Sequence, residues 1–173
     1  MTDVVWIGRG GQGAFTAARL LGAAYSLRDG GGYALAFPSF GPERRGAPMK
    51  AFTKLSAGPI SDRSEARSGD FSVYLDDTLL RTPASGAGKV LVNTSSTSDD
   101  PRVVSLDADG IAAEVLGSPI VNTVMLGALA ALLGGFAAED LDVGIENVLA
   151  ERLWDKNKKA ARKAYDAVAE TLR

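Results

Sequence analysis

The chain begins with an apolar run, a glycine-rich turn and an alanine- and leucine-rich stretch, and this succession constrains the fold more than any other feature. The run covers residues 4–7, the turn is Gly8-Arg9-Gly10-Gly11-Gln12-Gly13, and the stretch covers residues 14–27. A short apolar run followed by helix-forming residues predicts a strand and then a helix. The order strand, glycine turn, helix is typical of open α/β sheets, in which ligands bind at the carboxyl ends of the strands.

The glycine turn also predicts an anion site. Backbone N–H groups in such a turn and in the first turn of the helix lack partners, and the helix dipole adds partial positive charge. We therefore expect Gly8, Gly10, Gly11, Gln12 and Gly13 to bind a phosphate of a nucleotide-like ligand. The alternative is that these glycines serve only a tight turn and close packing of the strand against the helix.

Two familiar phosphate-binding schemes fit this turn poorly. Gly8 and Gly13 have the outer spacing of a P-loop, but Ala14 and Phe15 stand where a lysine and a hydroxyl are needed. A dinucleotide site requires an acidic residue at the end of the second strand, whereas the second apolar run, residues 33–37, is followed by proline and serine. An ATPase, a kinase or an ordinary NAD site is therefore disfavoured.

The rest of the chain predicts further strands and then a series of helices. A third strand is expected at 49–55, after the loop that follows the second apolar run, and valine-containing runs predict strands at 71–75, 89–92 and 103–106. Helical spacing predicts helices at 111–116, 123–133, 140–153 and 156–172. Residues 33–37 are expected to pair in parallel with residues 4–7, and the polar residues 56–69 to form a surface connection or a short helix. The expected fold class is α/β: a single domain, residues 1–173, with a Rossmann-like open sheet, mostly parallel, flanked by helices, and a helix-rich C-terminal third.

Composition excludes several classes of function. The sequence contains no cysteine and no histidine, so it forms no disulfide, no thiolate-held iron–sulfur cluster, no zinc site of the usual kind and no Ser–His–Asp triad. No spacing of its carboxylates, lysines or tyrosines points to a catalytic pair. A net charge of -2 argues against nucleic-acid binding. The longest apolar stretch, residues 124–136, is too short and too glycine-broken to span a membrane, and no cleavable signal opens the chain, so we expect a cytoplasmic protein.

Two further places suggest contacts to an anion. Arg44 and Arg45 lie in the loop 38–48, which prolines stiffen and glycines open, and this composition suits a phosphate clamp; solvated surface arginines are the alternative. Asn122 or Thr123 is expected to cap the helix 123–133, whose N-terminus could add to an anion site at the same sheet edge. A basic run on the last helix is interpreted as its solvated face, with docking to an acidic partner as the alternative: Lys156, Lys158, Lys159, Arg162 and Lys163.

Four collinear segments resemble the gamma subunit, or gamma domain, of the 2-oxoacid:acceptor oxidoreductases, typified by pyruvate:ferredoxin oxidoreductase. The segments are residues 8–13, 37–48, 91–94 and 121–128, and the resemblance covers nearly the whole chain. It implies a non-catalytic subunit that scaffolds a multi-subunit enzyme and helps to bind coenzyme A. The whole enzyme would convert a 2-oxoacid to acyl-coenzyme A and CO2.

The resemblance also implies partners. Thiamine diphosphate, Mg²⁺ and [4Fe–4S] clusters would lie on alpha, beta and delta-type subunits, with ferredoxin or an NAD-linked flavoprotein as the electron acceptor. The coenzyme A pyrophosphate would meet the glycine turn, and its 3′-phosphate would meet Arg44 and Arg45. Pyruvate, branched-chain, aryl-pyruvate and phenylglyoxylate oxidoreductases all remain open. Two alternatives stand beside this interpretation: a free-standing NADP-binding reductase in which Arg44 or Arg45 holds the 2′-phosphate, and a purely structural subunit.

Overall fold

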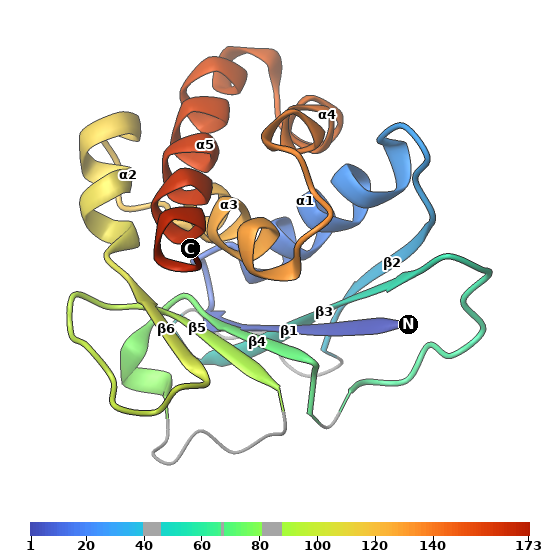
Figure 1. The fold of residues 1–173 in the computed structure, drawn as a ribbon, viewed down its shortest axis with the longest axis horizontal. Helices are drawn as coiled ribbons and strands as arrows, with labels where there is room; N and C mark the ends of the chain where they lie inside the picture. Colours follow the sequence, from blue (N-terminus) through green and yellow to red (C-terminus); the bar gives the residue numbers. More distant parts are fainter. Residues whose placement is uncertain (40–45, 67, 81–87) are drawn as a thin grey trace.

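Strands dominate the first two thirds of the chain and helices the last third (Figure 1). The computed structural model describes residues 1–39, 46–66, 68–80 and 88–173. In chain order the elements are β1 Thr2–Arg9, α1 Ala14–Leu27, β2 Tyr33–Pro38, β3 Pro48–Ser56, β4 Phe71–Tyr74, the 3₁₀ turn η1 Asp77–Leu79, β5 Lys89–Asn93, β6 Val103–Leu106, α2 Ala108–Leu116, α3 Asn122–Leu133, α4 Ala138–Val148, the 3₁₀ turn η2 Glu151–Leu153 and α5 Trp154–Thr171.

The strands that the structure describes form one six-stranded mixed sheet in the order β2-β3-β1-β4-β5-β6. β1, β4, β5 and β6 are parallel neighbours, whereas β3 pairs antiparallel with both β1 and β2. This arrangement confirms the open, mostly parallel sheet. The expected pairing of residues 33–37 with residues 4–7 is wrong, because β3 lies between these two strands.

The insertion of β3 follows from burial and from the length of the connection. Parallel neighbours need a crossover of about a dozen residues or more, whereas antiparallel strands need only a short turn. The connection from β2 to β3 spans only residues 39–47, so β3 returns alongside β2. Residues 51–55 of β3 are all buried, as in a central strand, whereas β2 is exposed or half-buried along its length and forms an edge of the sheet.

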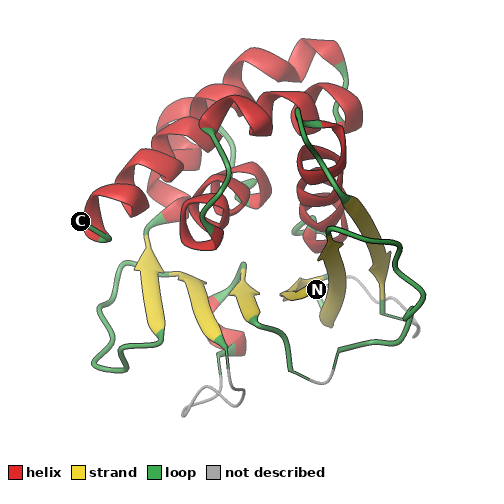
Figure 2. Cartoon of the chain, turned by 45° about the vertical axis from the view of Figure 1, so that its right-hand side comes forward, coloured by secondary structure: helices red, strands yellow, loops and turns green. Residues whose placement is uncertain are grey.

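The helices α1 to α5 gather over one face of the sheet (Figures 1 and 2). The main hydrophobic core lies between them and the sheet, and α3 is its centre, because residues 122–130 are all buried. Trp6 is fully buried on the helix-covered face. Its Nε1 donates to Thr53 Oγ1 at 3.0 Å, and that hydroxyl donates to the carbonyl of Ala18 in α1 at 3.0 Å. The polar atoms of the tryptophan and the threonine are thereby satisfied inside the core.

Most predicted elements are confirmed, with differences at their ends. α1 and β6 have the predicted bounds. The single helix expected at 140–153 is divided into α4 and η2, and the described part of residues 56–69 contains no helix. No helix in the described ranges combines the length and the apolar character that crossing a membrane requires.

Candidate anion-binding site

The glycine turn lies at the carboxyl end of β1, against the end of the connection between β2 and β3. Gly11 and Gly13 have φ angles of 94° and 84°, which side-chain-bearing residues rarely adopt. The Gly10 N–H donates to the Ala47 carbonyl at 2.9 Å, and the Gly46 N–H donates to the Gly10 carbonyl at 3.3 Å. The turn and the end of the loop 38–48 therefore share one edge of the sheet. The Gly10 N–H, however, is already used within the protein.

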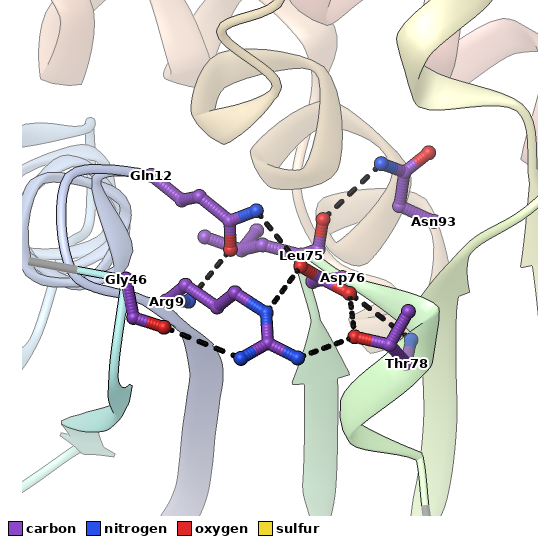
Figure 3. Close-up of polar contacts among 7 residues, drawn as sticks. All are labelled: Arg9, Gln12, Gly46, Leu75, Asp76, Thr78 and Asn93. Atoms are coloured by element: carbon purple, nitrogen blue, oxygen red, sulfur yellow. Dashed lines mark hydrogen bonds and ion pairs between the residues drawn. The ribbon is translucent and has the colours of Figure 1, made fainter.

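Arg9 and Gln12 fasten the turn to the end of β4 (Figure 3). Arg9 Nε contacts Asp76 Oδ2 at 3.0 Å, and the two terminal nitrogens of its guanidinium donate to the Gly46 carbonyl at 3.2 Å and to Thr78 Oγ1 at 2.7 Å. Gln12 Oε1 accepts from the Arg9 N–H at 2.6 Å, and Gln12 Nε2 donates to Asp76 Oδ2 at 3.2 Å. Both side chains therefore shape the turn with the atoms that would otherwise bind a ligand.

Asp76 is held ionised by this network. Its partial burial acts to raise the pKa of the carboxyl group, but the hydrogen bonds from Thr78 and Gln12 and the charge of Arg9 together outweigh that effect. The net result is a pKa below the usual value for an aspartate. The carboxylate is thus a fixed negative charge beneath the glycine turn.

Asn93 joins the neighbouring strand ends, and sequence reasoning did not single it out. Its Nδ2 donates to the Leu75 carbonyl at 3.2 Å (Figure 3), and its Oδ1 accepts from the backbone N–H groups of Ala108 at 3.0 Å and Asp109 at 3.3 Å. One buried amide therefore connects β4, β5 and the start of α2. The only sequence signal was its place at the end of a valine-rich strand, within the segment 91–94.

The N-termini of α1 and α3 meet beside the glycine turn. A Cβ atom on Gly13, the N-cap residue of α1, would lie only 2.7 Å from Nδ2 of Asn122, the first residue of α3. Asn122 Oδ1 accepts from the Thr123 N–H at 2.8 Å, which is the expected bond to a free helix N–H, although Val121 holds the N-cap position. Thr123 does not join this site: it is fully buried, and its Oγ1 donates to Asn157 Oδ1 at 2.7 Å.

Several donors at this meeting point have no acceptor. Within the described ranges, nothing accepts a hydrogen bond from the backbone N–H groups of Gly11, Gly13 and Ala14, nor from Asn122 Nδ2. α1 has no side-chain cap, and α3 has none from its N-cap residue. Two helix N-termini with free N–H groups favour negative charge.

A polar cleft next to the turn has the opposite character. Its volume is about 320 Å³, and Asp76, Asp77, Asp107 and Asp109 are among its lining residues. A phosphate inside it would face these carboxylates, which makes the cleft unfavourable for an anion. In the described part of the chain, no three or more Asp, Glu, His or Cys side chains are arranged to hold a metal ion.

The remaining predicted site residues divide into two groups. Gly8 is buried, and a Cβ atom there would lie 3.1 Å from Gln12 Oε1 and 3.2 Å from Leu75 Cδ1, so its place requires a small residue for packing. Arg44 and Arg45 lie outside the described residues.

Comparisons with known proteins agree with one another. Residues 3–167 match the family described as pyruvate ferredoxin/flavodoxin oxidoreductase. The chain is 44% identical to "Pyruvate synthase subunit PorC" of Methanothermobacter marburgensis, over 96% of this chain and 97% of that protein. The crystal structure of pyruvate oxidoreductase subunit PORC from Thermotoga maritima is similar with a TM-score of 0.80 and 33% identity, covering 95% of each chain.

A more distant structure shares the fold alone. It is the 2-oxoglutarate:ferredoxin oxidoreductase from Magnetococcus marinus, with 2-oxoglutarate, coenzyme A and succinyl-CoA bound. The TM-score is 0.76 at 18% identity, and the match covers 100% of this chain and 32% of that longer chain.

Proposed function

Because this chain belongs to the pyruvate ferredoxin/flavodoxin oxidoreductase family as a gamma-type subunit, we propose that it helps to bind coenzyme A within a multi-subunit 2-oxoacid oxidoreductase. The enzyme would convert a 2-oxoacid, pyruvate in the first instance, to acyl-coenzyme A and CO2. Thiamine diphosphate, Mg²⁺ and [4Fe–4S] clusters would be held by the alpha, beta and delta-type partner subunits. The absence of cysteine and histidine from this chain agrees with that division.

The observation that carries the proposal is the meeting of two helix N-termini at Gly13 and Asn122. The free N–H groups of Gly11, Gly13 and Ala14 and the amide of Asn122 form a set of donors that suits a diphosphate. This set of donors contains no carboxylate, whereas four carboxylates line the acidic cleft beside it. Coenzyme A supplies the thiol that accepts the acyl group, whereas this chain would bind and orient the phosphate end.

Arg44 and Arg45 keep their proposed role at the 3′-phosphate, which rests on the sequence alone. The end of their loop is anchored to the glycine turn through Gly46 and Ala47, which supports a common ligand for the two segments. Ferredoxin or an NAD-linked flavoprotein would accept the electrons from the partner subunits. A free-standing NADP-binding reductase is disfavoured, because the chain resembles subunits of a larger oxidoreductase over nearly its whole length.

The proposal is tested by Asn122→Asp in the assembled enzyme. The aspartate keeps the acceptor for the Thr123 N–H but replaces the Nδ2 donor by a charged oxygen, which repels phosphate. A lost hydrogen bond to a charged group costs about 1.5–3 kcal/mol, so the KM for coenzyme A should rise by roughly tenfold to a hundredfold while that for pyruvate stays unchanged. Asn147→Asp, on the exposed surface of α4, is the control.

Two outcomes would contradict the proposal. An unchanged KM for coenzyme A would favour the purely structural subunit. Equal effects on coenzyme A and pyruvate would point to a disturbed assembly rather than to a phosphate contact.

A further inference from the structure

The segment from Ser118 to the first residue of α3, Asn122, separates two recesses of opposite character. Pro119 and Val121 line the acidic cleft, whereas Ser118, Ile120 and Asn122 line a groove of about 200 Å³ on the other side. The groove continues between this segment and the start of α5, and most of its lining is apolar. Its other lining residues are Leu116, Leu149, Arg152, Leu153, Lys156 and Asn157.

Exposed apolar side chains border the groove. Ile120 is 52% exposed and Leu153 is 40% exposed, which places both among the large hydrophobic side chains that the fold leaves in contact with solvent. Apolar groups gathered around a groove are typical of surfaces that contact another protein. The groove is smaller than the roughly 300–1,000 Å³ of a typical small-molecule pocket, which favours insertion of one apolar side chain.

Both charged residues in the described lining of the groove are positive. Arg152 and Lys156 line it, and no carboxylate belongs to its described lining. Three other cations of the basic run have partners, since Lys158 pairs with Glu146, Arg162 with Asp142 and Lys163 with Glu114, whereas Lys159 forms no ion pair among the described residues. Within the described ranges neither Arg152 nor Lys156 forms an ion pair, although the protein as a whole carries a net negative charge.

We infer that this groove is the docking site for another subunit of the same oxidoreductase, which inserts an apolar side chain flanked by carboxylates. Arg152 and Lys156 would pair with those carboxylates, while Ile120 and Leu153 would bury their exposed area around the inserted side chain. Charge complementarity at such a rim accelerates association and selects the partner, and the apolar centre supplies most of the affinity. The inference rests on the proposed membership of a complex but not on coenzyme A binding.

The test is charge reversal at the rim, with assembly as the readout. A tagged chain carrying Arg152→Glu and Lys156→Glu is co-expressed with its partner subunits, and the assembled fraction and its dissociation constant are measured by size-exclusion chromatography with light scattering. Binding should weaken on the order of tenfold to a hundredfold, and its salt dependence should decrease. Lys159→Glu with Arg173→Glu makes the same change in charge elsewhere on and beyond α5 and should leave assembly unchanged.

A second pair of variants tests the apolar part. Ile120→Ser with Leu153→Ser should also weaken assembly, whereas Val143→Ser with Leu172→Ser, which are exposed on other surfaces, should not. Circular dichroism and thermal unfolding of the isolated chain show whether each variant folds like the parent.

Parental assembly of both groove variants would overturn the inference. Normal assembly combined with a raised KM for coenzyme A would also overturn it, in favour of a ligand subsite. Because assembly is measured without coenzyme A, failure of the proposed coenzyme A site leaves this readout unaffected.

Discussion

Gly13 lies at the proposed anion site and has a backbone conformation that favours glycine. Its positive φ favours glycine, and the amide of Asn122 occupies the space that a side chain would need. Gly11 shares the positive φ, but nothing lies within 4 Å of the position where its Cβ would be. Backbone conformation alone therefore favours glycine at position 11, whereas backbone conformation and lack of space both favour it at position 13. The sequence does not distinguish the two positions.

Alanine substitutions separate these two reasons. Gly11→Ala should lower the free energy of unfolding by about 1–2 kcal/mol, through backbone strain alone. Gly13→Ala should cost more, because the new methyl group would collide with Asn122 Nδ2 at 2.7 Å. Urea unfolding of the isolated chain measures both effects. In the double variant Gly13→Ala with Asn122→Ala the excess cost should disappear; additive losses would show that the collision is not its source.

The network around Asp76 makes stability depend on pH. Because the pKa of Asp76 is lower in the folded protein than its ordinary value of 3.8, the ionised carboxylate stabilises the fold above that value. This contribution is lost as the pH falls through the lower, folded-state pKa. Asp76→Asn should therefore reduce the free energy of unfolding at pH 7, and the difference from the parent should shrink as the pH falls below about 4.

The measurement is urea unfolding between pH 7 and pH 2.5. Asp77→Asn is the control, because Asp77 is exposed and forms no ion pair among the residues that the structure describes. A difference between Asp76→Asn and the parent that stays constant over this range would show that the carboxylate does not act through its charge.

At the scale of elements, glycine and alanine set how closely the helices approach. A Cβ atom on Gly127 of α3 would lie 2.0 Å from the Ala161 carbonyl of α5, and one on Gly144 of α4 would lie 2.6 Å from the Leu20 carbonyl of α1. The α5 face that packs toward α3 also carries small residues, including Ala160 and Ala164. The backbones therefore touch, and this contact keeps α3 buried with its N-terminus fixed at the site.

Gly127→Ala should consequently destabilise the protein although alanine is the better helix former. Forcing a methyl group into this contact should lower the free energy of unfolding by about 1–3 kcal/mol. Gly22→Ala in α1 is the matched control, because its new Cβ would have only ordinary contacts, at 3.6 Å or more. That variant should be neutral or gain up to about 1 kcal/mol. Thermal and urea unfolding distinguish the two, and equal effects would contradict the close packing of α3 on α5.

At the scale of the whole molecule, the two faces of the sheet differ. The helices cover one face (Figure 2), whereas a smaller apolar cluster of Val5, Ile7 and Phe52 lies on the opposite face, since Val5 and Ile7 alternate with Trp6 along β1. Lys54, only 2% exposed, holds that side together by contacting Asp3 Oδ1 at 3.0 Å and Asp62 Oδ2 at 3.1 Å. The proposed functional surfaces thus lie on the helix-covered side, at the carboxyl edge of the sheet. They are the glycine turn, the N-termini of α1 and α3, the acidic cleft and the groove.

The sequence by itself determined the structural features that depend on residues close together in the chain. The glycine turn, the bounds of α1 and β6 and the α/β class follow from local composition and periodicity, and four collinear segments sufficed to indicate the family. Only the tertiary structure decided how distant segments meet. The place of β3 between β1 and β2 depends on burial of both of its faces, which an apolar run does not reveal. Two contacts at the site likewise arise from long-range packing and hydrogen bonds: Gly13 with Asn122, and Asp76 with Arg9 and Gln12. Spacing along the chain does not specify which strand ends and helix termini become neighbours.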